Sequence, residues 1–455
     1  MSAKACRHLR NALIVVLVLA TLYVAYRYTL HCLVEAKLDE IRKQGYPVTL
    51  AELDKWYPQP PPGENAAEIY EDAFTRYARW DYEHIRVLPL VGDATLPKRG
   101  VPLSGDVRDA IASYMADNRS AVKLLHDGVA RKRCRYPVSY SAGFDTPVPH
   151  VNGVRQGARL LGLEAVWRSD KGDGEAVADS VAATAALARS LEDEPDGISQ
   201  LVRIAVLQMA ASRLEDALNC TPFTDTQLRD LYTVFANREI TNSLTRAFVG
   251  EIANNTSFFS VPVDRQLGVM LPPPPEPHTF QTIIGVIPNT WYRRPQFYLL
   301  RASGLLEIDL FHYCGIMEKY LAALRLPLPE RLTVARSIDK DFSKLPRFCI
   351  MSRWLTCGGS GMSAYIVKDF SVTATLRCCC ASLAVERYRL ANGALPDSLG
   401  DLVPKFLDAV PIDPFDGQPL RYRKLTKGYV VYSVGEDGKD DGGDEKKDIT
   451  FTVER

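Results

Sequence analysis

The stretch Ala381–Phe451 decides how the chain is organised, and it turns at Asn392-Gly393-Ala394-Leu395-Pro396-Asp397-Ser398. Before this turn, apolar residues recur every four positions, at Leu376, Cys380, Ala384 and Tyr388. This spacing predicts one apolar face of a helix. Asn392-Gly393 is expected to end that helix, because glycine adopts the left-handed conformation after a helix without steric cost.

The rest of the stretch predicts a short helix, a rigid loop and a hairpin. Asp397 or Ser398 can cap a helix over Leu399–Leu407. The prolines of Pro411–Pro419 indicate a rigid loop, since each fixes φ and removes a hydrogen-bond donor. Leu420–Lys424 and Tyr429–Val434 alternate around Lys427-Gly428, which predicts a β-hairpin. An acidic, glycine-rich loop then runs from residue 435 to 448.

This order of features resembles the periplasmic domain of the major pseudopilin of type II secretion, a relative of the type IV pilins. The resemblance rests on Tyr388-Arg389, Asn392-Gly393, Leu395-Pro396, Leu399, Leu402, Pro411-Ile412-Asp413-Pro414-Phe415, Gly417, Pro419, Tyr422, Tyr432-Ser433-Val434-Gly435 and Asp448-Ile449. It covers about the last sixth of the chain and implies a small α+β pseudopilin-like domain over residues 363–455. It also implies contacts with secretion-system proteins.

In those pseudopilins the acidic loop holds calcium, and the resemblance carries this role to Asp437 and Asp448. Asp440, Asp441 and Asp444 are further candidate ligands on chemical grounds, because calcium takes six to eight oxygen ligands. The spacing is not that of an EF-hand. A solvated acidic loop without a metal is the alternative, since most runs of charge are simply exposed to water.

The chain departs from the pseudopilin pattern at its amino terminus and in the proline-rich loop. Its apolar run begins at Ala12 without the leader, the glycine and the fifth-position glutamate of that family, so filament assembly is not expected. Asp416 adds a residue to the loop, and Phe415 stands where the family usually has tryptophan.

The amino-terminal apolar run predicts a membrane anchor. Asn11–Tyr26 contains no charge, and with Leu30–Val34 it reaches the ~20 residues that a membrane span requires. Lys4, Arg7 and Arg10 precede it and favour a cytoplasmic amino terminus. We therefore expect a cytoplasmic segment (1–11), a single-pass anchor in the inner membrane (12–34) and a periplasmic remainder. A cleaved signal peptide is the alternative, but no Ala-x-Ala site follows the run.

Length and composition limit the number of domains and the kinds of partner that the sequence can indicate. The 455 residues indicate two or three domains, and equal numbers of basic and acidic residues, 55 each, give no pull toward nucleic acid. We accordingly expect no nucleic-acid partner. The ten cysteines show no Cys-x-x-Cys spacing, and the triplet Cys378-Cys379-Cys380 is expected to be buried as small apolar residues.

The middle of the chain predicts an α-helical body over residues 35–352, joined by a flexible segment (353–362) to the C-terminal domain. Expected helices of ~20 residues with short connectors, Gly174–Leu191 and Ile198–Leu218 among them, indicate stacked helical hairpins. The succession of the anchor, Trp56-Tyr57-Pro58 and Glu64-Asn65-Ala66-Ala67 resembles that of anchored bacterial envelope proteins. The expected fold class is therefore mainly α.

No catalytic residues are predicted. None of the seven histidines lies in a His-Glu-x-x-His pattern, and no nucleophile elbow or phosphate-binding loop is present in the sequence. We expect a non-enzymatic protein with a structural or protein-interaction role in the cell envelope. The alternative is a membrane-tethered hydrolase with its site in the helical body, since a catalytic triad needs no local motif.

Overall fold

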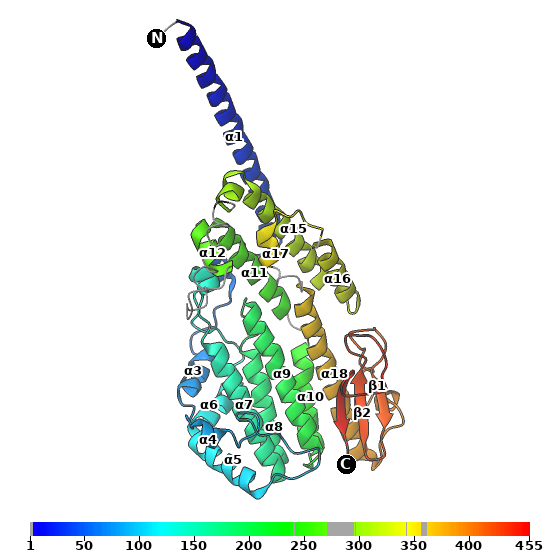
Figure 1. Cartoon of the computed structure of the whole chain (residues 1–455). Coiled ribbons are helices and arrows are strands. Elements are labelled where there is room, and N and C mark those ends of the chain that lie inside the picture. The colour runs from blue at the N-terminus through cyan, green and yellow to red at the C-terminus, as the bar shows by residue number, and fades with distance from the viewer. Residues whose placement is uncertain (1–2, 240–241, 271–294, 296, 343, 356–361) are drawn as a thin grey trace, which may run out of the picture.

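The structure, a computed structural model, describes residues 3–239, 242–270, 295, 297–342, 344–355 and 362–455. It is mainly helical, with 64% helix against 5% strand, and has one long apolar helix at the amino terminus and a small antiparallel sheet at the carboxyl terminus (Figure 1). This confirms the coarse fold class. The prolines of residues 272–277, which predict a stiff linker or surface loop, and most of the predicted joint (356–361) lie outside the described residues, so the domain boundaries stay predictions.

Helix α1 (Ala3–Lys43) is one unbroken helix that projects from the body (Figure 1). Within it, Arg7–Lys43 contains a stretch that is long and apolar enough to cross a membrane and that the protein does not bury. The last turns were expected to continue into solvent. Instead Val34, Leu38 and Ile41 are buried, because α1 packs against α15 (Leu305–Leu324).

The body is built from helices that pack mainly against their neighbours in sequence. Three of them, α7 (His150–Asp170), α8 (Gly174–Arg189) and α9 (Gly197–Leu218), pack against one another, as expected of stacked helical hairpins. The other body helices are α2 (Leu50–Trp56), α3 (Ala67–Thr75), α4 (Tyr82–Ile85), α5 (Gly105–Asp117), α6 (Arg119–Asp127), α10 (Asp225–Glu239), α11 (Ser243–Ser260), α12 (Val263–Met270), α16 (Glu330–Phe342) and α17 (Ile350–Leu355), with 3-10 turns η1 (Gly128–Ala130) and η2 (Tyr140–Asp145).

The C-terminal module consists of α18 (Ser363–Asn392) and a three-stranded antiparallel sheet in the order β1-β2-β3. The predicted hairpin is present, with Arg421 opposite Tyr432 and Lys424 opposite Tyr429. Its turn requires glycine, since Gly428 has φ +78° and a Cβ there would lie 1.7 Å from the Val453 carbonyl oxygen. The strands are β1 (Arg421–Lys424), β2 (Tyr429–Ser433) and β3 (Ile449–Val453), and β3 was not predicted.

The end of α18 is where the sequence predicts it, but the helix after it is shorter than expected. Gly393 ends α18 with φ +71°, and its N–H donates to the Arg389 carbonyl. The helix expected over Leu399–Leu407 is only the 3-10 turn η4 (Leu399–Leu402). Pro404 explains this difference, because the residue before a proline avoids helical backbone angles, and Val403 is extended.

The middle of helix α18 is enclosed on all sides. It packs against α9 and α10 of the body and against β2 and β3 of the sheet. Every residue from Cys378 to Glu386 is buried. The three consecutive cysteines point in different directions around the helix and are all covered, which confirms that they are buried small residues.

Candidate functional site

The acidic loop holds four of its five candidate carboxylates near the surface. Asp437 and Asp444 are exposed, and each accepts a hydrogen bond from the backbone N–H two residues further on. Asp440 accepts from the Tyr432 hydroxyl at 3.0 Å, and Asp441 pairs with Lys447 at 2.8 Å. In the described part of the chain, no three Asp, Glu, His or Cys side chains are gathered closely enough to hold a metal ion.

Asp448 differs from the other four because it is buried, with 6% of its surface exposed. Its Oδ2 accepts a hydrogen bond from the Gly443 N–H at 2.7 Å. Its Oδ1 is also buried but has no hydrogen-bond partner among the described residues. A buried carboxylate oxygen without a partner is costly, so Asp448 is the one member of the set with an unmet need for a ligand.

Another aspartate of the module, Asp413, organises the proline-rich loop. It is fully buried, and it accepts hydrogen bonds from the Ser433 hydroxyl, the Val434 and Phe415 N–H groups and the Arg421 guanidinium. With its carboxylate satisfied in this way, Asp413 is a structural residue that joins the loop to β2. Sequence reasoning noted this residue only as part of the family pattern.

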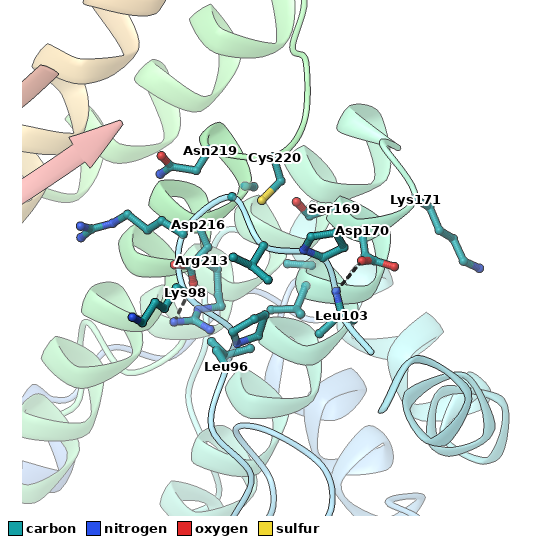
Figure 2. A pocket seen from close by; sticks show the side chains of 18 of the residues that line it. Leu96, Lys98, Leu103, Ser169, Asp170, Lys171, Arg213, Asp216, Asn219 and Cys220 are labelled. Atoms are coloured by element: carbon teal, nitrogen blue, oxygen red, sulfur yellow. Dashed lines mark hydrogen bonds and ion pairs between the residues drawn. The ribbon is translucent and has the colours of Figure 1, made fainter. Parts of the chain in front are cut away.

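A pocket of about 490 Å³, lined by polar and apolar residues, lies at the carboxyl ends of α7 and α9 (Figure 2). The segment 96–103 lies across these helix ends, and we call it the strap. Apolar strap residues such as Leu96, Val101 and Leu103 line one side, and Ser169, Asp170, Asp216 and Cys220 lie on the helix side. Its volume is typical of a site for a small molecule or a short peptide segment.

The pocket has charges of both signs. Asp170 accepts from the Leu103 N–H at 2.9 Å. Burial raises its pKa, but the hydrogen bonds from Arg108 and Leu103 and the Arg108 charge outweigh burial, so the pKa of Asp170 is lowered. Arg213 and Asp216 form an ion pair at 3.0 Å, and burial raises the pKa of Asp216. Figure 2 shows Lys171 directed away from the other labelled side chains. Burial also raises the pKa of Cys220, so this exposed thiol is poorly prepared to act as a nucleophile.

Arg99 ties the strap to two other parts of the molecule. Its guanidinium donates to Glu215 of α9 at 2.7 Å and to Glu445 of the acidic loop. The strap over the pocket and the candidate calcium loop therefore share one side chain. No local sequence pattern could reveal this link, because Arg99 and Glu445 are 346 residues apart.

Two side chains of α9 cover the free edge of the sheet. Glu215 accepts a hydrogen bond from the Thr452 N–H at 2.9 Å, and Asn219 contacts both the Thr452 carbonyl and the Glu454 N–H. An uncovered strand edge would be open to pairing with other chains. Burial raises the pKa of Glu215 to about 7, although its contacts with Thr452 and Arg99 favour the ionised form.

Two histidines pair with glutamates in the body, and neither pair follows a sequence motif. His126 lies 2.8 Å from Glu164. Burial lowers the pKa of His126, but the hydrogen bond to Glu164 and the charge of Glu164 raise it by more, so the pKa is raised overall. Ser180 also donates to Glu164, but a serine nucleophile would need to contact the histidine instead. His150 and Glu194 are both buried and lie 2.9 Å apart, with the Tyr136 ring stacked on His150.

Comparison of the chain with protein-family models, with curated proteins and with solved structures found no match.

Proposed function

We propose that this chain is a non-enzymatic protein anchored by α1 in the inner membrane, with its body and C-terminal module in the periplasm. One observation carries the anchoring. The apolar part of α1 is exposed, while the same unbroken helix ends with Val34, Leu38 and Ile41 buried in the body. A membrane span continuous with the protein core fixes the body to the bilayer without a hinge.

The role we propose is contact with other proteins of the cell envelope, including secretion-system proteins. A pseudopilin-like fold for residues 363–455 is part of this proposal. A long helix packed against an antiparallel three-stranded sheet supports it. The pocket beneath the strap is the proposed contact site, because apolar residues and charges of both signs together suit a peptide segment of a partner.

Crosslinking from the pocket in the membrane of a bacterial host tests the contact. A photo-crosslinking residue replaces Lys98 in the strap of the full-length protein, and the matched control replaces Lys123, an exposed lysine of α6. We expect a discrete protein adduct from position 98 that position 123 does not give. A secretion-system component in that adduct would support the family role. Equal adduct patterns from both positions would contradict a partner at the pocket.

Topology is tested separately. Alkaline phosphatase fused after Arg455 is active only outside the cytoplasm, so the fusion should be active in a bacterial host. An inactive fusion at normal expression would place the body in the cytoplasm.

We also propose that the acidic loop binds calcium through Asp448 and Asp437, with Asp440, Asp441 and Asp444 as weaker candidates. The unpartnered, buried Oδ1 of Asp448 supports this, and the loop glycines that precede it, Gly438, Gly442 and Gly443, adopt the positive φ angles that let a backbone fold closely around a cation. The other carboxylates already accept local hydrogen bonds, so the loop would have to rearrange around the ion.

Thermal unfolding of the full-length protein in detergent tests calcium binding. A ligand at a hundredfold excess over its Kd stabilises the folded state by about 2.7 kcal/mol, which corresponds to a rise in Tm of several degrees. The Asp448→Asn variant should lose most of this rise, and Asp444→Asn should keep most of it. Identical unfolding of the wild type in millimolar calcium and in chelator would show that the loop is only an acidic surface.

A further inference from the structure

A short helical segment, residues 297–302, precedes α15. The carboxyl end of this segment is hydrogen-bonded to the anchor helix α1. The Tyr23 hydroxyl donates to the Ala302 carbonyl at 2.5 Å, and the Tyr26 hydroxyl donates to the Ser303 carbonyl at 3.0 Å. Arg27 donates to the Arg301 carbonyl at 2.5 Å and also pairs with Glu307. Figure 1 shows this segment, in yellow-green, at the end of the body from which α1 projects.

The two helices also approach closely at Gly304, which follows the segment. A Cβ at this position would lie 2.5 Å from Leu30 Cδ1 and 3.3 Å from the Tyr26 ring. Glycine there, with φ +80°, lets the chain turn directly on the surface of α1.

The length of the apolar run places this contact at the membrane surface. Between Arg10 and Arg27 the charge-free run covers residues 11–26, about 24 Å of helix at 1.5 Å per residue. The hydrocarbon core of a bilayer is about 30 Å thick, so the run has no length to spare. Arg27 is held against the body by the Arg301 carbonyl and Glu307, so we place it at the membrane surface and not inside the anchor first expected over residues 12–34. Tyr23 is one turn closer to the bilayer centre than Arg27, and the chain bonded to Tyr23 lies at the same depth.

The chemistry of the segment suits that depth. Tyr298 and Leu299 are 51% and 69% exposed, and Tyr23, Tyr26 and Tyr28 of α1 are exposed as well. Tyrosine is enriched at membrane interfaces because its ring is apolar and its hydroxyl is polar. The carbonyls of residues 301–303, which end the segment, each accept a hydrogen bond from a side chain of α1, as backbone groups near lipid require.

We propose that residues 297–304 form a second membrane-contacting element, which lies in the interfacial region of a lipid bilayer beside α1. The partner is the lipid surface itself, with Leu299 among the acyl chains and Tyr298 at the headgroups. Arg301, which donates to the Val261 carbonyl, lies at the same level, where lipid phosphates are found. This inference rests on the proposed anchoring by α1.

Crosslinking to lipid tests the inference on the full-length protein in nanodiscs of phosphatidylethanolamine and phosphatidylglycerol. A photo-crosslinkable phenylalanine analogue replaces Leu299 in one variant. It replaces Val16, a position inside the anchor, in another. Leu390, an exposed leucine at the far end of α18, is the matched control. Lipid adducts from position 299 should exceed those from 390 about tenfold, the ratio that burying one leucine side chain in lipid supports.

The three positions separate the two ways to fail. Adducts from 16 but only control levels from 299 would overturn the membrane contact of the segment and leave the anchoring intact. Control levels at 16 would show that α1 is not in the bilayer, which overturns the proposed anchoring and this inference together. Protein adducts in place of lipid adducts at 299 would also overturn it, since the segment would then face a protein.

Discussion

Helices α1 and α18 each contain a long apolar stretch, yet the stretch of α1 before Arg27 is exposed on all sides, whereas residues 378–386 of α18 are enclosed on all sides. The difference lies in the size of the side chains. Residues 13–19 of α1 are all leucine, isoleucine or valine, whereas residues 378–384 of α18 are cysteine, alanine and serine with a single leucine. Small side chains let α9, α10, β2 and β3 approach α18 closely, while large ones suit loosely packed lipid chains. For a helix without a polar face, side-chain size therefore distinguishes a membrane anchor from a central helix.

The largest expected effect comes from a charge in the enclosed helix. Ala381 is fully buried, and Ala381→Asp would place an unpaired carboxylate among apolar neighbours. We expect a loss of roughly 4 kcal/mol or more in the free energy of unfolding, measured by denaturant titration of the full-length protein in detergent. Ala381→Ser is the control of nearly equal size. A loss below 1 kcal/mol for the aspartate would mean that α18 is not enclosed.

The same kind of substitution in α1 should act on membrane insertion instead. Arginine at the centre of a membrane helix costs about 2.5–3.5 kcal/mol of insertion free energy. Val16→Arg should therefore increase the fraction of protein released from membranes by alkaline washing, with Val16→Leu as the control. The denaturant midpoint of the body should not change. A shift of that midpoint would indicate that α1 packs against protein at residue 16.

The stability of the sheet that covers α18 should depend on pH, because Glu215 is hydrogen-bonded to that sheet. Its folded pKa of about 7 lies above the unfolded value of about 4.3, so the folded protein retains a proton that the unfolded chain releases. The contribution of Glu215 to the free energy of unfolding therefore falls by on the order of 2 kcal/mol as the pH rises from about 4.5 to 7. The Glu215→Gln substitution should remove this change of the free energy of unfolding with pH. It should stabilise the protein most, relative to the wild type, above pH 7. The exposed Glu64→Gln should keep the slope, and a slope unchanged in Glu215→Gln would show that another group causes it.

The smallest effect is expected at Asn219, which holds β3 against α9. Asn219→Ala removes the contacts with the Thr452 carbonyl and the Glu454 N–H, which should cost about 1 kcal/mol and speed hydrogen exchange in β3. Asn392→Ala is the control, because that exposed side chain bonds only within α18. Unchanged exchange in β3 would mean that the sheet does not depend on this edge contact.

The sequence predicted the features whose causes are local. The end of α18 follows from Gly393, and the hairpin follows from alternation around Gly428. The expected helix over Leu399–Leu407 was wrong because Pro404 disfavours helical backbone angles at Val403. Strand β3 was not predicted, although Ile449-Thr450-Phe451-Thr452-Val453 alternates as a strand does, because the acidic loop between β2 and β3 is far longer than the short turn that signals a hairpin.

The features that could not be predicted depend on residues far apart in the chain. Glu215 contacts Thr452, and Arg99 contacts Glu445, across more than two hundred residues, and neither pair has a local pattern. The pocket likewise arises only where the strap crosses two helix ends. Among the candidate carboxylates, the resemblance singled out Asp437 and Asp448 together, and only folding makes Asp448 buried and Asp437 exposed.

The unbroken path of α1 into the body has a consequence for reach. The carboxyl ends of α7 and α9 lie at the opposite end of the body from α1 (Figure 1), and α9 alone, with 22 residues, is about 33 Å long. With α1 in the membrane as we propose, the pocket would stand at a height of about that order above the bilayer. A membrane protein with only short loops would then not reach it, whereas a soluble protein, or one with a domain at the same height, would.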